Sequence, residues 1–213
     1  MRSRSELIRE LSQELDPAPR LRGPFQLALL WWIGAWIFVV AVTLAVQPMR
    51  PGFAGQLLAS PRFAAETLLG IAAGALAIGA AFAVGIPGWG PARRWIVLAL
   101  GALALWAGAY FYGLVDPALE PSMLGKRALC FAEVLIYGLP ILIAGLLLLR
   151  RLAPLERWSA GLVTGAAAGA IPALLMQLAC LYIPSHILIF HLAPALALAL
   201  LGSLLGRVLL RRI

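Results

Sequence analysis

Two cysteines and a few ionisable residues near them are the part of this sequence best suited to chemistry. Cys130 and Cys180 are the only cysteines in the 213 residues. Glu133 lies one helical turn after Cys130, whereas His186 and His191 follow Cys180. Thiolate and imidazole together suit soft or borderline metal ions such as copper, zinc or cadmium. Without a CxxC or HExxH pattern, the spacing leaves open a metal site, a redox-active thiol pair and two small buried apolar residues.

The elements that must position these residues are six nearly uncharged runs. About 20 apolar residues are needed to cross a bilayer as a helix. The chain is 62% apolar and only 12% charged, which excludes an ordinary soluble domain and a disordered chain. We therefore predict an all-α fold, an integral membrane bundle of six transmembrane helices. The predicted spans cover about residues 25–46, 66–86, 95–115, 128–149, 158–182 and 187–207.

Positive charges flank these runs unevenly. With both termini on one side, thirteen Lys and Arg residues fall on that side and four on the other. The positive-inside rule then places the N- and C-termini in the cytoplasm. This topology accounts for the net charge of +8, because the arginines flank spans and do not gather in one patch. We expect contact with membrane lipid and no direct contact with nucleic acid.

The same topology brings the two cysteines together. Cys130 lies three residues into the fourth span, and Cys180 lies three residues from the outer end of the fifth. These spans are joined by a short inner loop, so their outer ends lie at a similar depth and can meet the Cα separation of about 4.4–6.8 Å that a disulfide needs. Glu133, His186 and His191 are further candidates at this end, as metal ligands or as their supporting partners. Glu133 is also close enough to the surface to face water.

The polar tail, residues 1–24, forms a separate cytoplasmic segment ahead of the transmembrane domain, residues 25–213. Ser3 and Glu6 match a capping box at a helix start. Four apolar side chains then share one helix face, within an arc of about 100°. They are Leu7, Ile8, Leu11 and Leu15. A lone helix of this length is marginal in water, so its apolar face needs a protein groove or the chain's own loops to cover it.

Glycines recur at every fourth position in several runs. They are Gly70 and Gly74, then Gly161, Gly165 and Gly169, and finally Gly202 and Gly206. Small residues at this spacing allow two helix backbones to approach closely within a bilayer. We read them as packing residues.

Several segments, taken in order, resemble the NrsF-type membrane anti-sigma factors. They are LIRELSQEL, DPAPRLRGP and LLWW at the start, the spaced Cys130 and Cys180, the SHILIFHLAP run, and the LLGSLLGRVLLRR ending. The resemblance covers nearly the whole chain. It implies a protein that is not an enzyme and that keeps an extracytoplasmic-function sigma factor inactive at the bacterial inner membrane.

The resemblance also implies roles for particular residues. Cys130 and Cys180 would be the thiols that sense metal or oxidative stress. The apolar face of the tail (Leu7, Ile8, Leu11 and Leu15) would contact the sigma factor. The sequence departs from the family at one point, because the family's second cysteine often lies in a His-Cys-Pro setting, whereas Ala179 and Leu181 flank Cys180 here. Ligation of a metal by a neighbouring histidine is therefore open.

Two other functions use the same features. A membrane thiol oxidoreductase would pass electrons through the cysteines, although such relay enzymes normally contain a second thiol pair and this chain has none. A small transporter would need polar groups at mid-membrane and interrupted helices, for which Pro140 and Pro172 are the candidates.

Overall fold

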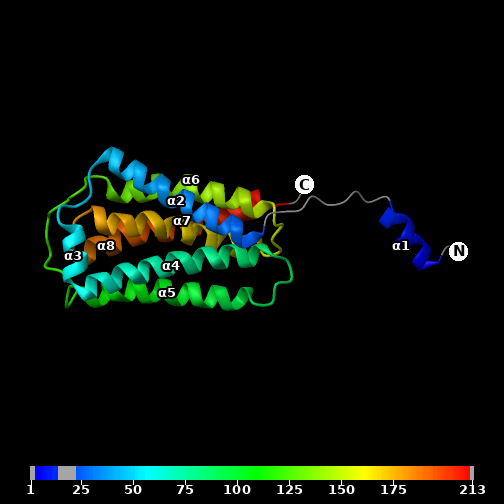
Figure 1. Cartoon of the computed structure of the whole chain (residues 1–213), viewed down its shortest axis with the longest axis horizontal. Helices are drawn as coiled ribbons and strands as arrows, with labels where there is room; N and C mark the ends of the chain where they lie inside the picture. Colours follow the sequence, from blue (N-terminus) through cyan, green and yellow to red (C-terminus); the bar gives the residue numbers. More distant parts are fainter. Residues whose placement is uncertain (1–2, 14–22, 212–213) are drawn as a thin grey trace.

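Six long helical segments lie side by side in one bundle (Figure 1). The computed structural model describes residues 3–13 and 23–211. Within that part, six segments are long and apolar enough to cross a membrane, so the chain is a multi-pass membrane protein and the all-α prediction is confirmed. They are α2 (Pro24–Val46), α4 (Pro61–Gly85), α5 (Ala92–Gly113), α6 (Cys130–Arg150), α7 (Arg157–Ala179) and a continuous segment of α8 (Pro184–Ile187), η1 (Leu188–Leu192) and α9 (Ala193–Leu209).

The two ends of the bundle differ in what they hold. The helix α2 begins at the end that follows the polar tail, which we call the tail end. At the opposite end lie the last residues of α2, α5 and α7 and the first residues of α4, α6 and α8. Both cysteines lie there, so we call it the thiol end. Short α3 (Phe53–Ala59), which we did not predict, lies between α2 and α4 at this end (Figure 1).

Both cysteines lie closer to helix ends than we predicted. The fifth span was expected to continue to residue 182, but α7 ends at Ala179 because Cys180 is extended, with φ −101° and ψ 177°. Two residues later, Tyr182 pairs with Ser122 in an isolated antiparallel bridge. The helix α6 begins at Cys130 itself, whereas the predicted span began at residue 128. The cysteines therefore mark the start of one helix and the end of another.

The tail helix α1 (Arg4–Gln13) begins with the predicted capping box. The Ser3 N–H donates to Glu6 Oε2 at 2.8 Å, and the Glu6 N–H donates to Ser3 Oγ at 3.3 Å. Figure 1 draws α1 clear of the bundle, with Ile8 59% exposed. Of the predicted apolar face, the side chains of Leu7 and Leu11 and all of Leu15 lie outside the described residues.

The helix α7 is the centre of the bundle because glycines let α9 pack directly on its backbone. In its most apolar window 83% of the residues are buried, against 22% for α2. A Cβ atom on Gly165 would collide with the carbonyl oxygen of Leu198 in α9. Gly161 and Gly202 approach each other in the same way, so the small-residue spacing does serve helix packing.

We expect Gly165→Val to destabilise the protein by about 3 kcal/mol, the upper end of the usual cost of overpacking, because the added atoms meet backbone that cannot move aside. Thermal unfolding in detergent, followed by circular dichroism, measures the effect. Gly101→Val is the matched control, since no atom lies within 4 Å of a Cβ built at Gly101. Equal unfolding midpoints for the two variants would show that α7 and α9 are not packed in this way.

The two prolines within spans do not interrupt their helices. Pro140 lies inside α6 and Pro172 inside α7, and both helices continue past them. Neighbouring helices in a bilayer compensate for the backbone bond that proline removes. Neither helix therefore has the break that the transporter hypothesis required of it.

Candidate metal and thiol site

Four side chains at the thiol end converge into what we call the thiol–imidazole group. Its members are Cys130 and Cys180 with His186 of α8 and His191 of η1, and their ligand atoms all lie within 4.8 Å of one another. Both cysteines are free and buried. His191 is fully buried, whereas His186 is partly exposed. The structure thus brings together two cysteines and two histidines that are up to 61 residues apart in sequence.

The distances within this group suit a four-coordinate metal ion. His186 Nε2 lies 3.1 Å from Cys130 Sγ and 3.6 Å from Cys180 Sγ. Ligands around a tetrahedral zinc ion lie about 3.6 Å apart, given zinc–sulfur bonds of about 2.3 Å and zinc–nitrogen bonds of about 2.0–2.1 Å. Two sulfur and two nitrogen donors are a common set for this geometry. The group could therefore hold a metal ion after a movement of about 1 Å.

His191 supplies an independent reason to consider a ligand at this position. Neither of its ring nitrogens has a hydrogen-bond partner of ordinary geometry among the described residues, although the side chain is fully buried and lies beside the Cys180 thiol. Buried polar groups in proteins are almost always paired. Coordination of one nitrogen to a metal would satisfy this imidazole.

A π-helical turn places both histidines on the same side of the sixth span. Five residues separate His186 from His191, and in an α-helix they would differ in direction by about 140°. In η1 the Ala193 N–H instead bonds to the carbonyl of Leu188, five residues back. This wider turn brings the two rings to a centroid distance of 5.2 Å. Such turns are rare and occur often at functional sites.

Hydrogen bonds within the group favour a thiolate. The hydrogen bond with Cys130 is the largest cause that lowers the pKa of the Cys180 thiol, and the hydrogen bond with His186 acts in the same direction. The thiolate is the form of cysteine that binds metals and attacks disulfides. The thiol pair is therefore held in an environment that suits metal binding.

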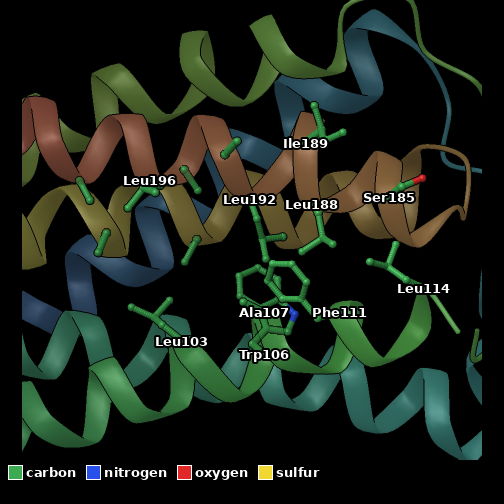
Figure 2. A pocket seen from close by; sticks show the side chains of 15 residues that line it. Leu103, Trp106, Ala107, Phe111, Leu114, Ser185, Leu188, Ile189, Leu192 and Leu196 are labelled. Atoms are coloured by element: carbon green, nitrogen blue, oxygen red, sulfur yellow. The ribbon is translucent and has the colours of Figure 1, made fainter. Parts of the chain in front are cut away.

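The opposite side of the π-helical turn faces an apolar pocket of about 620 Å³ between α5 and α9 (Figure 2). Leu188, Ile189 and Leu192 line this pocket, whereas His191, from the same turn, belongs to the thiol–imidazole group. Across the pocket lie Trp106 and Phe111 of α5. None of the four candidate ligands lines the pocket, so it is separate from the site.

Glu133 is placed away from the candidate ligands, with a different partner. Its Oε2 accepts a hydrogen bond of 2.8 Å from Nη1 of Arg127, and the Arg127 side chain is fully buried. Nη2 of Arg127 donates to the carbonyl oxygen of Thr43 at 3.1 Å and also to that of Gln47. Glu133 thus balances the charge of an arginine that joins the start of α6 to the end of α2.

A second buried arginine, Arg50, is hydrogen-bonded to the backbone of Cys180. Nη1 of Arg50 donates to the carbonyl oxygen of Cys180 at 3.1 Å. The guanidinium also lies over the rings of Phe63 and Tyr182, at 5.4 and 5.9 Å from their centroids. Burial lowers the pKa of Arg50. Gly125, with φ +77°, allows this approach, because a Cβ there would lie 2.9 Å from the Arg50 side chain.

The segment after Cys180 is held by a second set of polar contacts. The Tyr182 hydroxyl donates to Glu66 Oε2 of α4 at 2.9 Å and accepts the Ala118 N–H at 3.2 Å. One turn before Cys180, Gln177 Nε2 donates to Thr67 Oγ1 at 3.1 Å. These bonds fix the position of Cys180 relative to α4.

Sequence reasoning missed both arginines because it counted them as loop charges exposed to solvent. One observation could have identified them. Arg50 and Arg127 fall on the side of the predicted topology that carries few positive charges. An arginine on that side is expected to bind a specific acceptor or acidic residue. The pairing of Arg127 with Glu133, six residues later, was also visible in the sequence.

Comparisons with known proteins identify the family of the chain. The model of the family described as "Negative regulator of sigma F" matches residues 11–211. A curated relative, the "Anti-sigma-F factor NrsF" of Caulobacter vibrioides, is 32% identical over 219 residues, which cover 96% of this chain and 95% of the relative. No solved structure matches the chain. Matched over nearly its whole length by this family and by this relative, the chain belongs to the NrsF family of negative regulators of sigma F.

Proposed function

We propose that this protein holds an extracytoplasmic-function sigma factor at the bacterial inner membrane and releases it under metal or oxidative stress. Membership of the family supports an anti-sigma role. The observation that carries the sensing part is the thiol–imidazole group, in which four metal-binding side chains lie within 4.8 Å of one another. In this proposal the metal ion is the stimulus and is not a resident cofactor.

The distribution of arginines supports the orientation. With both termini in the cytoplasm, the thiol end faces the periplasm, where soft metal ions and oxidants arrive first. Disulfides form and persist in that compartment. Cys130 and Cys180 are then the sensing thiols, with His186 and His191 as the additional metal ligands. Oxidation of the two thiols to a disulfide would use the same two residues without the histidines.

The tail would bind the sigma factor through the apolar face of α1. Ile8 is exposed on this helix, which is too short to be stable alone in water. Residues 3–15 carry a net charge of −1, from three glutamates against Arg4 and Arg9, which favours a groove with basic surroundings over an anionic lipid surface. Leu7, Leu11 and Leu15 complete the proposed contact.

The test is purification of the tagged full-length protein from unstressed cells in mild detergent after light crosslinking. A sigma factor should co-purify, and Ile8→Glu should reduce its yield by about tenfold or more, because a carboxylate would enter an apolar groove. Gln13→Glu adds the same charge at a position outside the apolar face that the sequence predicts and should leave the yield unchanged. If no sigma factor co-purifies with the unmodified protein, the proposed function is wrong.

A further inference from the structure

The helix α2 is the span that continues directly from the tail, and it is the least buried of the six. Only 22% of its most apolar window is buried, so the other helices leave most of α2 uncovered. A helix held by few contacts along its length depends on the contacts at its ends. A change at those end contacts can therefore displace α2.

At the thiol end, α2 is bonded to the neighbourhood of both cysteines, in each case by one buried arginine. Arg50 follows α2 by four residues and donates to the carbonyl oxygen of Cys180. Arg127 precedes Cys130 by three residues and donates to the carbonyl oxygens of Thr43 and Gln47 at the end of α2. One arginine thus comes from the α2 side and the other from the α6 side.

These bonds are strong for two physical reasons. The acceptors are carbonyl groups at the C-terminal ends of α2 and α7, where the helix dipole is negative and favours a cation. Both guanidinium groups are also buried, and hydrogen bonds from an ionised donor are stronger where water is excluded. Arg127 is further fixed by Glu133 in the first turn of α6. A displacement of either cysteine must therefore displace the end of α2 or break one of these bonds.

In the half of α2 nearer the tail end, a third contact joins α2 to the middle of α6. Trp31 Nε1 donates to the carbonyl oxygen of Ile141 at 3.1 Å. Gly145 makes room for the indole, since a Cβ there would lie 2.8 Å from Trp31 Cζ2. The helix α2 is thus bonded at its thiol end to Arg127, which precedes α6, and in its other half to the middle of α6.

We propose that α2 carries the state of the thiol–imidazole group to the cytoplasmic tail, with Arg127 and Arg50 as positioning residues. This inference rests on the proposed function. Metal binding must draw ligand atoms that are up to 4.8 Å apart to about 3.6 Å. That rearrangement shifts Cys130 and Cys180 relative to each other, and each takes its arginine with it. The end of α2 then shifts, and α2 transmits the shift to the segment that binds the sigma factor.

The test compares Arg127→Gln with the unmodified protein in two measurements. Cd²⁺ affinity is measured on purified protein in detergent by competition with a chromophoric chelator. Release of the sigma factor is measured as its co-purification with and without Cd²⁺. Glutamine is uncharged and cannot reach Glu133 and the α2 carbonyls together. Lys126→Gln is the matched control, because it removes the same charge from the exposed neighbouring residue.

We expect Arg127→Gln to bind Cd²⁺ as the unmodified protein does and to hold the sigma factor without Cd²⁺, while Cd²⁺-induced release falls about tenfold. Lys126→Gln should behave like the unmodified protein. Normal release from an Arg127→Gln variant that binds Cd²⁺ would overturn the inference and leave the proposed function standing. An unmodified protein that binds Cd²⁺ without releasing the sigma factor would overturn both.

Amide hydrogen exchange on the unmodified protein tests the same inference if Arg127→Gln does not fold. Addition of Cd²⁺ should change exchange at both ends of α2, at residues 43–50 and 23–30, and change it less in α5, which contributes no ligand. Unchanged exchange at both ends of α2, in protein that has bound Cd²⁺ and released its sigma factor, would contradict transmission through this helix.

Discussion

Replacement of Cys180 by serine is expected to lower the affinity of the purified protein for Cd²⁺ or Zn²⁺ by about a hundredfold or more. Four-ligand zinc sites contribute about 10–16 kcal/mol at neutral pH, or about 3 kcal/mol for each ligand. Each 1.4 kcal/mol corresponds to about tenfold in affinity. A serine hydroxyl stays protonated at neutral pH, so it cannot replace the thiolate. Competition with a chromophoric chelator in detergent measures this loss.

The matched control for this prediction is Ser185→Ala. Ser185 is adjacent to His186 but is not a member of the thiol–imidazole group. Its replacement should change the affinity by less than about threefold, the usual context-dependent variation. A Cys180→Ser variant that binds the metal as tightly as the unmodified protein would place any metal site elsewhere.

The second large effect is expected in cells. In the double variant Cys130→Ser/Cys180→Ser, the tail is unchanged and the sigma factor should stay bound. Cd²⁺ or a thiol oxidant should then fail to induce transcription that depends on the sigma factor, whereas the unmodified protein should allow a rise of about tenfold or more. A transcriptional reporter for that sigma factor measures the difference.

Met123→Ser is the control for the cellular experiment. Met123 lies exposed in the loop before α6, at the same end of the bundle as the cysteines. This variant should respond as the unmodified protein does. A normal response from the double cysteine variant would remove the thiols from the sensing step, even if the sigma factor were found on the tail.

The six spans could be predicted because their lengths and apolar character are properties of each segment alone. The approach of Cys130 and Cys180 followed from the order of the spans and a short connecting loop. The positions of the two histidines could not be predicted from spacing. Regular α-helical geometry would place His186 and His191 on different sides of one helix, and only the π-helical turn brings them together.

The burial of the two arginines could not be predicted for a different reason. A loop arginine is usually solvated, and its burial depends on acceptors supplied by distant segments. Arg50 finds the carbonyl of Cys180, 130 residues away, and Arg127 finds that of Thr43, 84 residues away. Glu133 was recognised as a functional candidate inside a span, but its actual partner lies before that span begins. The bonds to distant carbonyl groups belong to the tertiary structure and leave little trace in local sequence, whereas the Arg127–Glu133 pair joins residues only six positions apart.

The π-helical turn also governs how this protein can change in length. A π-helical turn holds one residue more than regular α-helix needs, so deletion of one residue of the turn before His191 restores regular helix and leaves α9 in register. His186 and His191 would then be four residues apart and would differ in direction by about 40°, so both would stay beside the thiols. A deletion in the first turn of α9 would instead rotate everything beyond it by about 100°, and Gly202 and Gly206 would turn away from α7. The π-helical turn is therefore the place in the sixth span where the chain can lose one residue and keep both the site and the packing that supports it.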